Sequence, residues 1–174
     1  MTIMRRTSVL LLVMVSASCN IRRDTKPREP ELLTGSNAAS VEAGVRTLMA
    51  TVAHDVTQEG PLAWNRYFED SRAFFMAVNG QMAFANGAAA RNGIQNVALS
   101  LKHIDLKWGD DLRVDPLTPE LAVVAAPWQE IQIDSTGHRV DETGFFTGLA
   151  EFRDGRWQFR NAHWSSPVSA AARQ

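Results

Sequence analysis

The sequence predicts an α+β domain in which helices cover one face of a bent antiparallel sheet. Apolar residues recur at helical spacing mainly in residues 40–101. In residues 104–166, apolar and polar residues mostly alternate. Two dipeptides, Asn79-Gly80 and Asp154-Gly155, each lie between alternating runs. Such dipeptides are strong hairpin signals because both turn residues need positive φ. Helices followed by a run of antiparallel strands are typical of the α+β class.

The composition is that of one ordinary globular domain. The chain has 174 residues, of which 45% are apolar and 21% are charged, and this length is enough for a real core. The formal net charge is -1, with no basic block beyond a short one near the N-terminus. We therefore expect no nucleic-acid partner.

The N-terminus has the pattern of a secretory signal. Arg5 and Arg6 precede the apolar run 9–15 and the small residues 16–18, which is the order of a signal peptide. Cys19, the only cysteine, follows directly and resembles the acylated cysteine of a bacterial lipobox. The alternative is an ordinary signal peptide cut near Ala17 or Cys19. We expect an exported protein of the cell envelope, either lipid-anchored at Cys19 or periplasmic.

The chain is then expected to divide into four parts. These are a signal peptide at 1–18, a flexible tether at 19–38, one domain at 39–168 and a disordered tail at 169–174. The tether is polar and contains two prolines, which is typical of a linker.

Helices and hairpins are expected in a definite order within the domain. Apolar residues at helical spacing predict a first helix over 40–58 with Ser40 as its N-cap. Gly60-Pro61 predicts the end of that helix and the start of a short second one. A hairpin over 74–85, in which Phe75 faces Phe84 and Ala77 faces Met82, a third helix over 88–101, strands up to residue 133 and a final hairpin over 143–166 complete the order. Pro127 predicts an edge or a bulge in its strand.

The final hairpin predicts one wall of a pocket. Counting from the Asp154-Gly155 turn, Gly148 faces Asn161 and Phe146 faces His163. These four residues share one face with further, mostly apolar residues near the turn, namely Ala150, Phe152, Trp157 and Phe159. A face that is apolar near the turn and polar far from it is what a pocket wall requires.

Ligand-binding candidates come from this wall and from the aromatic residues. Trp64 and Tyr67 on the short helix, and Trp128 beside Pro127, are expected to line an apolar cavity. Asn161 has no side chain opposite it, so its amide could meet a ligand, a water molecule or a neighbouring side chain. Trp164 is expected on the other face of the hairpin.

His163 and Asp55 are the candidate acid–base groups. His163 could act as a general base or hydrogen-bond a ligand, or it could hold the last strand through a structural hydrogen bond. Asp55 lies beside the apolar stripe of the first helix and could reach the pocket mouth, or it could be a solvated acid. His54, His103 and His138 form no metal-binding spacing with an acidic residue, and no phosphate loop or nucleophile elbow is present. We therefore expect no metal and no cofactor.

Several stretches resemble the nuclear transport factor 2-like superfamily, in its SnoaL-like and ketosteroid-isomerase-like branch. They are GPLAWNRYFEDSRAFFMAVNG, NGAAARNGI, PELAVVA and DGRWQFRNAHWSSP, and the resemblance covers most of residues 40–167. It implies a cone-shaped, curved sheet over three helices, with a pocket at the wide end. Isomerases of this fold combine a carboxylate base with tyrosine and acid donors. Here Tyr67 is the only tyrosine and we identify no such base on a strand, which argues against ketosteroid isomerase chemistry.

Three functions remain open at this point, because members of this superfamily include isomerases, dehydratases, cyclases and proteins without a known reaction. The first is an exported, lipid-anchored domain that binds a small apolar or partly polar ligand. The second is an isomerase- or dehydratase-type enzyme that uses His163 and Asp55. The third is an interaction module that forms a homodimer through the outer face of the sheet.

Overall fold

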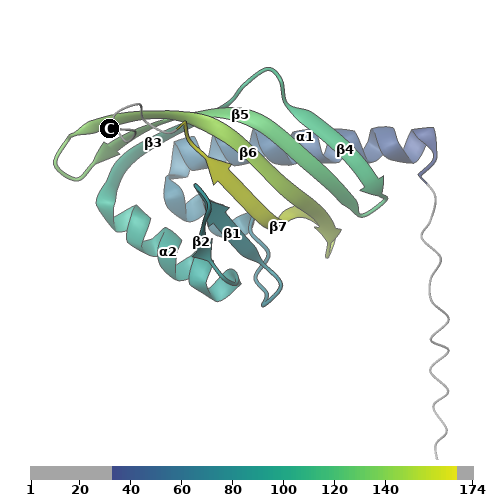
Figure 1. Cartoon of the computed structure of the whole chain (residues 1–174), viewed down its shortest axis with the longest axis horizontal. Coiled ribbons are helices and arrows are strands. Elements are labelled where there is room, and N and C mark those ends of the chain that lie inside the picture. The colour runs from purple at the N-terminus through teal and green to yellow at the C-terminus, as the bar shows by residue number, and fades with distance from the viewer. Residues whose placement is uncertain (1–32, 168–174) are drawn as a thin grey trace, which may run out of the picture.

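The computed structural model describes residues 33–167 and shows helices on one side of a curved sheet (Figure 1). The helical elements are α1 (Gly35–Glu59), the 3-10 helix η1 (Pro61–Arg66) and α2 (Gly87–Ser100). The strands are β1 (Phe75–Val78), β2 (Gln81–Phe84), β3 (Leu101–Trp108), β4 (Arg113–Thr118), β5 (Leu121–Asp134), β6 (Arg139–Arg153) and β7 (Arg156–Ser165). The expected signal peptide, Cys19, most of the tether and the tail lie outside the described residues.

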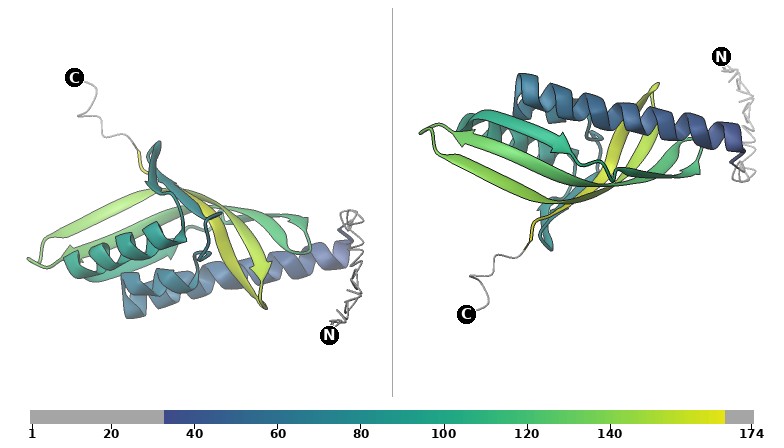
Figure 2. Two further views of the ribbon diagram at one scale, coloured as in Figure 1. Left: turned by 90° about the horizontal axis from the view of Figure 1, so that it is seen from below. Right: turned by 90° about the horizontal axis from the view of Figure 1, so that it is seen from above.

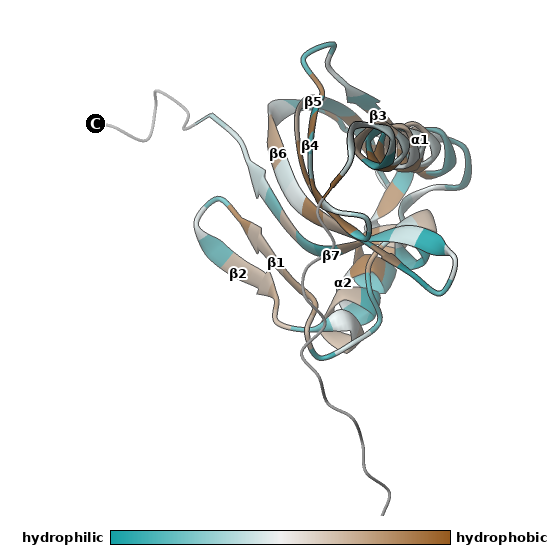
Figure 3. Cartoon of the chain, turned by 90° about the vertical axis from the view of Figure 1, so that its right-hand side faces the viewer, coloured by the Kyte–Doolittle hydropathy of each residue, from teal (hydrophilic) through white to brown (hydrophobic). Residues whose placement is uncertain are grey.

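One seven-stranded sheet carries the domain. Its order is β2-β1-β7-β6-β5-β3, with β4 also paired to β5. All these pairs are antiparallel except β1 with β7. Seen along α1, the sheet bends around α1 and α2 (Figure 3), and in two further views α1 lies along one face of the sheet (Figure 2). The predicted α+β fold, a curved sheet over three helical segments, is confirmed.

Helix α1 begins earlier than predicted. Thr34, not Ser40, is the N-cap, and its side chain accepts a hydrogen bond from the backbone N–H of Asn37. Residues 35–38, which we assigned to the tether, are therefore helical. One face of α1 packs against the sheet, and Gly44 on that helix leaves room for the indole of Trp157, which a Cβ atom would meet.

Both predicted Xaa-Gly turns are present. Asn79 and Gly80 have φ of 50° and 80°, and Asp154 and Gly155 have φ of 53° and 80°. These angles match the type I′ turns that suit the twist of a hairpin.

The first hairpin keeps its predicted register only next to the turn. Ala77 faces Met82 as predicted. The register then shifts between Met76 and Ala77, so that Phe84 pairs with Met76 and not with Phe75.

The final hairpin also departs from its predicted register. The pairs from Arg153–Arg156 to Ala150–Phe159 are as predicted, but a bulge follows and Leu149 faces Asn161. The bulge coincides with a change of neighbour on the other edge of β7. Phe159 exchanges backbone hydrogen bonds with the chain at 67–69, whereas Asn161 and the residues after it pair with β1. An extra residue in one strand accommodates such a change and inverts the faces beyond it.

Strand β5 is central, as expected from its apolar start. It pairs with β6 along its whole length and with β3 and β4 on its other edge. Pro127 lies between the last β3 pair, Trp108–Trp128, and the first β4 pair, Arg113–Ala125. Its missing N–H thus falls at an interruption of the neighbouring strand, as a proline in a sheet requires.

The core lies between α1 and the inner face of the sheet. Its largest fully buried side chains are Phe74, Phe146, Phe159 and Met49, together with valines of α1 and β5. No helix among residues 33–167 is long and apolar enough to cross a membrane.

Candidate functional site

A cavity of about 520 Å³ opens between the helical segments and the inner face of the sheet. It is bounded by η1, α2 and the strands β1, β2, β3, β5, β6 and β7. Its lining consists of Pro61, Trp64, Phe68, Met76, Val78, Asn79, Phe84, Ile94, Val97, Ile104, Trp128, Glu130, Gln132, Glu142, Trp164 and Ser166. We refer to this space as the cavity.

Three tryptophans form an aromatic wall of the cavity. The ring of Trp164 meets that of Trp64 edge-on at 5.6 Å between centroids, and that of Trp128 at 5.3 Å. Trp64 in turn stacks on Phe68 at 5.0 Å. Edge-to-face pairs of this kind add to the stability that burial alone provides. The wall is therefore held by its own packing as well as by the strands.

Polar side chains gather at one end of the same space. Trp128, Glu130 and Gln132 alternate along β5, so all three point to the inner face. Glu142 on β6 is the direct cross-strand neighbour of Glu130. The cavity is thus apolar over most of its surface and acidic at this end.

The environment of Glu130 disfavours its charge. Burial raises the pKa of Glu130 above its ordinary value, the hydrogen bond donated by the Gln132 amide opposes this rise, and the nearby Glu142 adds to it. A carboxyl group whose pKa is raised by an apolar site can hold or exchange a proton closer to neutral pH than an ordinary glutamate.

Two of the predicted ligand-binding residues lie where the sequence placed them. Trp64 and Trp128 both line the cavity and are 7% and 6% exposed. Tyr67, the third aromatic candidate, is buried but does not line the cavity.

Phe146 and Gly148 belong to the packed interior and do not line the cavity. Phe146 is fully buried and its ring contacts those of Trp164 and Phe159 at 4.9 and 5.2 Å. A Cβ atom on Gly148 would lie 2.9 Å from the ring of Phe146, so the space opposite Gly148 is filled. The predicted gap at this glycine is therefore wrong.

Asn161 and His163 lie on the outer face because of the bulge in β7. The side-chain oxygen of Asn161 accepts a hydrogen bond of 3.1 Å from the backbone N–H of Leu149. His163 pairs with Thr147 and is exposed. The predicted pairs Gly148–Asn161 and Phe146–His163 are wrong, and the position of His163 no longer supports its role in a pocket.

The same inversion brings Trp164 to the inner face. It pairs with Phe146 and lines the cavity, whereas the sequence placed it on the outer face.

Asp55 lies at the junction of α1 and η1 and does not line the cavity. Its carboxylate accepts hydrogen bonds from the hydroxyl of Tyr67, the guanidinium of Arg66 at 2.7 Å and the ring nitrogen of His54 at 3.0 Å. These three donors hold the pKa of Asp55 far below its ordinary value. Arg66 also binds Glu59, which ties the end of α1 to η1.

Sequence reasoning missed the acidic end of the cavity. The alternation along β5 indicated that Trp128, Glu130 and Gln132 share a face, and this pattern was a usable signal for a carboxylate on a strand. Glu142 lines the cavity because of the β5–β6 register, and Met76 lines it because β1 pairs with β7. Neither pairing is visible in a short sequence window.

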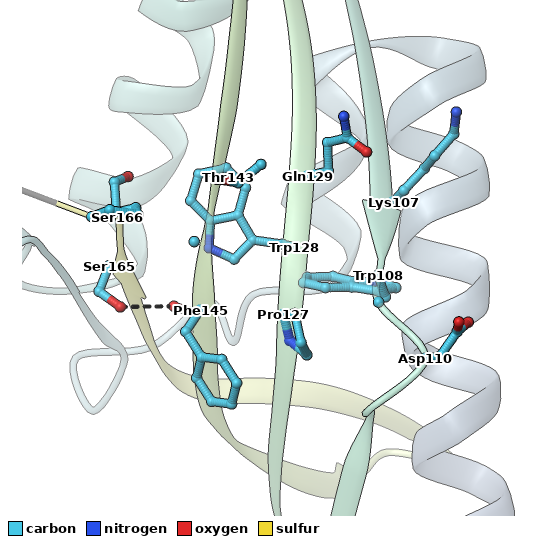
Figure 4. A pocket seen from close by; sticks show the side chains of 13 residues that line it. Lys107, Trp108, Asp110, Pro127, Trp128, Gln129, Thr143, Phe145, Ser165 and Ser166 are labelled. Atoms are coloured by element: carbon cyan, nitrogen blue, oxygen red, sulfur yellow. Dashed lines mark hydrogen bonds between the residues drawn. The ribbon is translucent and has the colours of Figure 1, made fainter. Parts of the chain in front are cut away.

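A second hollow, the outer groove, adjoins the cavity, and Trp128 and Ser166 line both (Figure 4). It has a volume of about 710 Å³ and is lined by residues that include Lys107, Asp110, Gln129, Thr143 and Phe145. The hydroxyl of Ser165 donates a hydrogen bond of 3.1 Å to the Phe145 carbonyl at its edge (Figure 4). Its polar groups point in several directions and do not converge as those of the cavity do.

No group of three or more metal-binding side chains occurs within residues 33–167. The cavity lining offers the carboxylates of Glu130 and Glu142 and the amides of Gln132 and Asn79, without a histidine or cysteine.

Comparisons with known proteins bear on the fold. No family model matches the chain, and no curated protein matches it. Among solved structures, a nuclear transport factor 2-like superfamily protein from Salmonella enterica serovar Typhimurium LT2 is 13% identical with a TM-score of 0.65, over 76% of this chain and 94% of that one. A hexachlorocyclohexane dehydrochlorinase, LinA-type3 from Novosphingobium barchaimii LL02, is 13% identical with a TM-score of 0.62, over 78% and 92%.

A third similar structure is a nuclear transport factor 2-like protein of unknown function from Shewanella oneidensis MR-1. It is 17% identical with a TM-score of 0.57, over 72% of this chain and 99% of that one. At such identities the similarity concerns the fold and leaves the activity open. On this similarity and on its own architecture, the chain has the nuclear transport factor 2-like fold.

Proposed function

We propose that this protein binds a small, mostly apolar molecule in the cavity, with a polar group of the ligand at Glu130. The observation that carries the proposal is the cavity itself, about 520 Å³ with aromatic and aliphatic walls and converging polar groups at one end. Ligand sites in proteins are commonly apolar hollows of about 300–1,000 Å³ with a few well-placed polar groups. The side chains at the polar end project from neighbouring strands, which fixes their relative positions.

A variant that fills the cavity tests this proposal. Val97 on α2 lines the cavity, so Val97→Trp should displace the ligand. Leu99 on the same helix is 81% exposed and does not line it, so Leu99→Trp is the matched control. Native mass spectrometry of the purified proteins should show a co-purified small molecule in the wild type and in Leu99→Trp, and none in Val97→Trp. A molecule retained equally by both variants would place the binding site elsewhere.

We further propose that the domain is exported and anchored by a lipid on Cys19. The support is the order of charged, apolar and small residues before this single cysteine. Cys19→Ala should move the protein from the membrane fraction to the soluble fraction after cell lysis. A wild-type protein that is already soluble would leave plain secretion as the explanation of the same segment.

An acid–base enzyme of the isomerase or dehydratase type is the second candidate. The observation in its favour is the raised pKa of Glu130 inside an apolar cavity, which suits a proton-transfer group. Glu130 takes the place of His163 and Asp55 in this hypothesis, because His163 is on the outer face and Asp55 is held by three donors. Conversion of the co-purified molecule by the wild type, and its loss in Glu130→Gln, would distinguish an enzyme from a binding protein.

A homodimer through the outer face of the sheet also stays a proposal. Phe75 and Phe145 lie on that face and are 42% and 47% exposed. Light scattering of the purified protein measures its mass in solution.

A further inference from the structure

We propose that the ligand of the cavity is a cation, namely a protonated amine on an apolar, ring-sized body. The ammonium group would lie between Glu130 and Glu142, and the body would pack on the tryptophan wall. This inference rests on the proposed function of the cavity as a ligand site and specifies the chemical class of its ligand.

The charge of the cavity lining points to this class. The two charged residues among its 16 lining residues are both acidic, and none of the 16 is lysine, arginine or histidine. Glu130 and Glu142 are direct neighbours across two strands, and like charges in such positions repel each other. A positive charge between them relieves that repulsion and compensates for the hydration that Glu130 loses on burial.

The two carboxylates also lack a cationic partner within the described part of the chain. Glu130 is half-buried and Glu142 is exposed, and neither forms an ion pair there, although other half-buried or buried acids do: Asp55 pairs with Arg66, Glu69 with Arg153 and Glu151 with Arg160. Withdrawing the Glu130 carboxylate from water without a cationic partner is costly. Within the described residues, arginines therefore pair with acids that connect parts of the fold, and none pairs with Glu130 or Glu142.

The walls of the cavity suit a cation with an apolar body. Trp64, Trp128 and Trp164 all line it, and the face of a tryptophan ring attracts an ammonium group more strongly than that of other aromatic residues. The aliphatic side chains of Ile94 and Ile104 offer the contact surface that an apolar body requires.

Trp128 carries a buried polar atom without a partner. It is 6% exposed, lines the cavity and has no hydrogen-bond partner for its Nε1 among the described residues. It lies two residues before Glu130 on β5, roughly 7 Å along the strand. This donor is itself buried and Trp128 also lines the outer groove, so it does not define a ligand contact in the cavity.

Three probes of nearly equal shape and different charge test the inference. They are 1-naphthylmethylammonium, 1-naphthylmethanol and 1-naphthoate, titrated separately into the purified protein at pH 7.5 by isothermal calorimetry. We expect the ammonium to bind at least about tenfold more tightly than the alcohol, as an aromatic wall and two carboxylates imply. The naphthoate should bind most weakly.

Variants connect the preference to the two carboxylates. Glu130→Gln and Glu142→Gln should each reduce the ammonium-to-alcohol affinity ratio several-fold while the alcohol affinity changes little. Asp141→Asn is the matched control, because Asp141 is an exposed acid next to Glu142 on β6, but it pairs with Arg139 and does not line the cavity. Circular dichroism of each variant confirms that it is folded.

The possible outcomes separate the inference from the function on which it rests. Equal affinities for the ammonium and the alcohol, or tightest binding of the naphthoate, overturn the cationic ligand and leave the cavity as an apolar binding site. An ammonium preference that survives both glutamine variants also overturns it. Binding of none of the three probes contradicts the proposed function as well.

Discussion

Two carboxylates in different parts of the fold have opposite environments. At the α1–η1 junction, Asp55 accepts hydrogen bonds from Tyr67, Arg66 and His54, and its pKa is far below the ordinary value. In the cavity, burial raises the pKa of Glu130, and its one side-chain hydrogen bond comes from the neutral amide of Gln132. The junction uses the charge of its acid to hold two helical segments together.

The cavity wall leaves the charge of its acid without a protein partner. An acid that stabilised the fold would be expected to have donors like those of Asp55. Glu130 instead faces apolar side chains and a second carboxylate, an arrangement that is unfavourable for folding and useful for binding or proton transfer. The difference between the two acids is therefore the one expected between a structural site and the ligand site that we propose.

The largest difference that we predict between the two acids is in the stability of their variants. Tyr67→Phe removes the hydroxyl that donates to Asp55, and should lower the free energy of unfolding by about 1.5 kcal/mol, the low end for a hydrogen bond to a charged group, because Asp55 keeps Arg66 as a partner. Glu130→Gln should leave that free energy unchanged or raise it, because it removes a carboxylate that burial disfavours.

Urea unfolding of the wild type, Tyr67→Phe and Glu130→Gln at pH 7.5 measures both effects. The dependence of the unfolding free energy on urea concentration should have the same slope in all three proteins. Destabilisation by Glu130→Gln as large as that by Tyr67→Phe would show that Glu130 is also a structural residue. Tyr67→Phe without effect would show that Arg66 alone holds the junction.

Much of the fold could be predicted from local sequence. Asn79-Gly80, Asp154-Gly155 and Gly60-Pro61 act through backbone angles that few other residues adopt, and they lie at turns or helix boundaries in the structure. The start of α1 was missed because Thr34 caps as well as Ser40 does, and no apolar stripe marks the first turn.

The site was less predictable, since it depends on pairings between distant segments. The bulge after Phe159 follows from a change of neighbour on the edge of β7, first the chain at 67–69 and then β1. Nothing in the hairpin's own sequence requires this change. One extra residue exchanged His163 for Trp164 on the inner face, and thereby replaced a candidate base with an aromatic wall.

The dependence of stability on pH gives a smaller and sharper test, because the two acids should act with opposite sign. The folded-state pKa of Glu130 is raised above the ordinary value near 4.5, so the folded state binds the proton more tightly than the unfolded chain does. Its contribution is therefore fully present below that ordinary value and is lost as pH rises through the raised pKa. The folded-state pKa of Asp55 is lowered, so its contribution is present above the ordinary value near 3.8 and is lost as pH falls below it.

The melting temperatures of wild type and Glu130→Gln, measured between pH 4 and 8, should differ more as the pH rises. The melting temperature of Glu130→Gln should equal that of the wild type near pH 4, where Glu130 is protonated and resembles an amide. It should exceed the wild-type value by a few degrees at pH 8, where the wild type must bury a charge beside Glu142. Tyr67→Phe should instead show a nearly constant deficit between pH 4 and 8, because the pKa of folded Asp55 lies below this range, and the deficit should shrink only in stronger acid, where Asp55 loses its charge. A constant offset between Glu130→Gln and wild type at every pH would mean that the cavity does not disfavour the charge of Glu130, and the contrast with Asp55 would disappear.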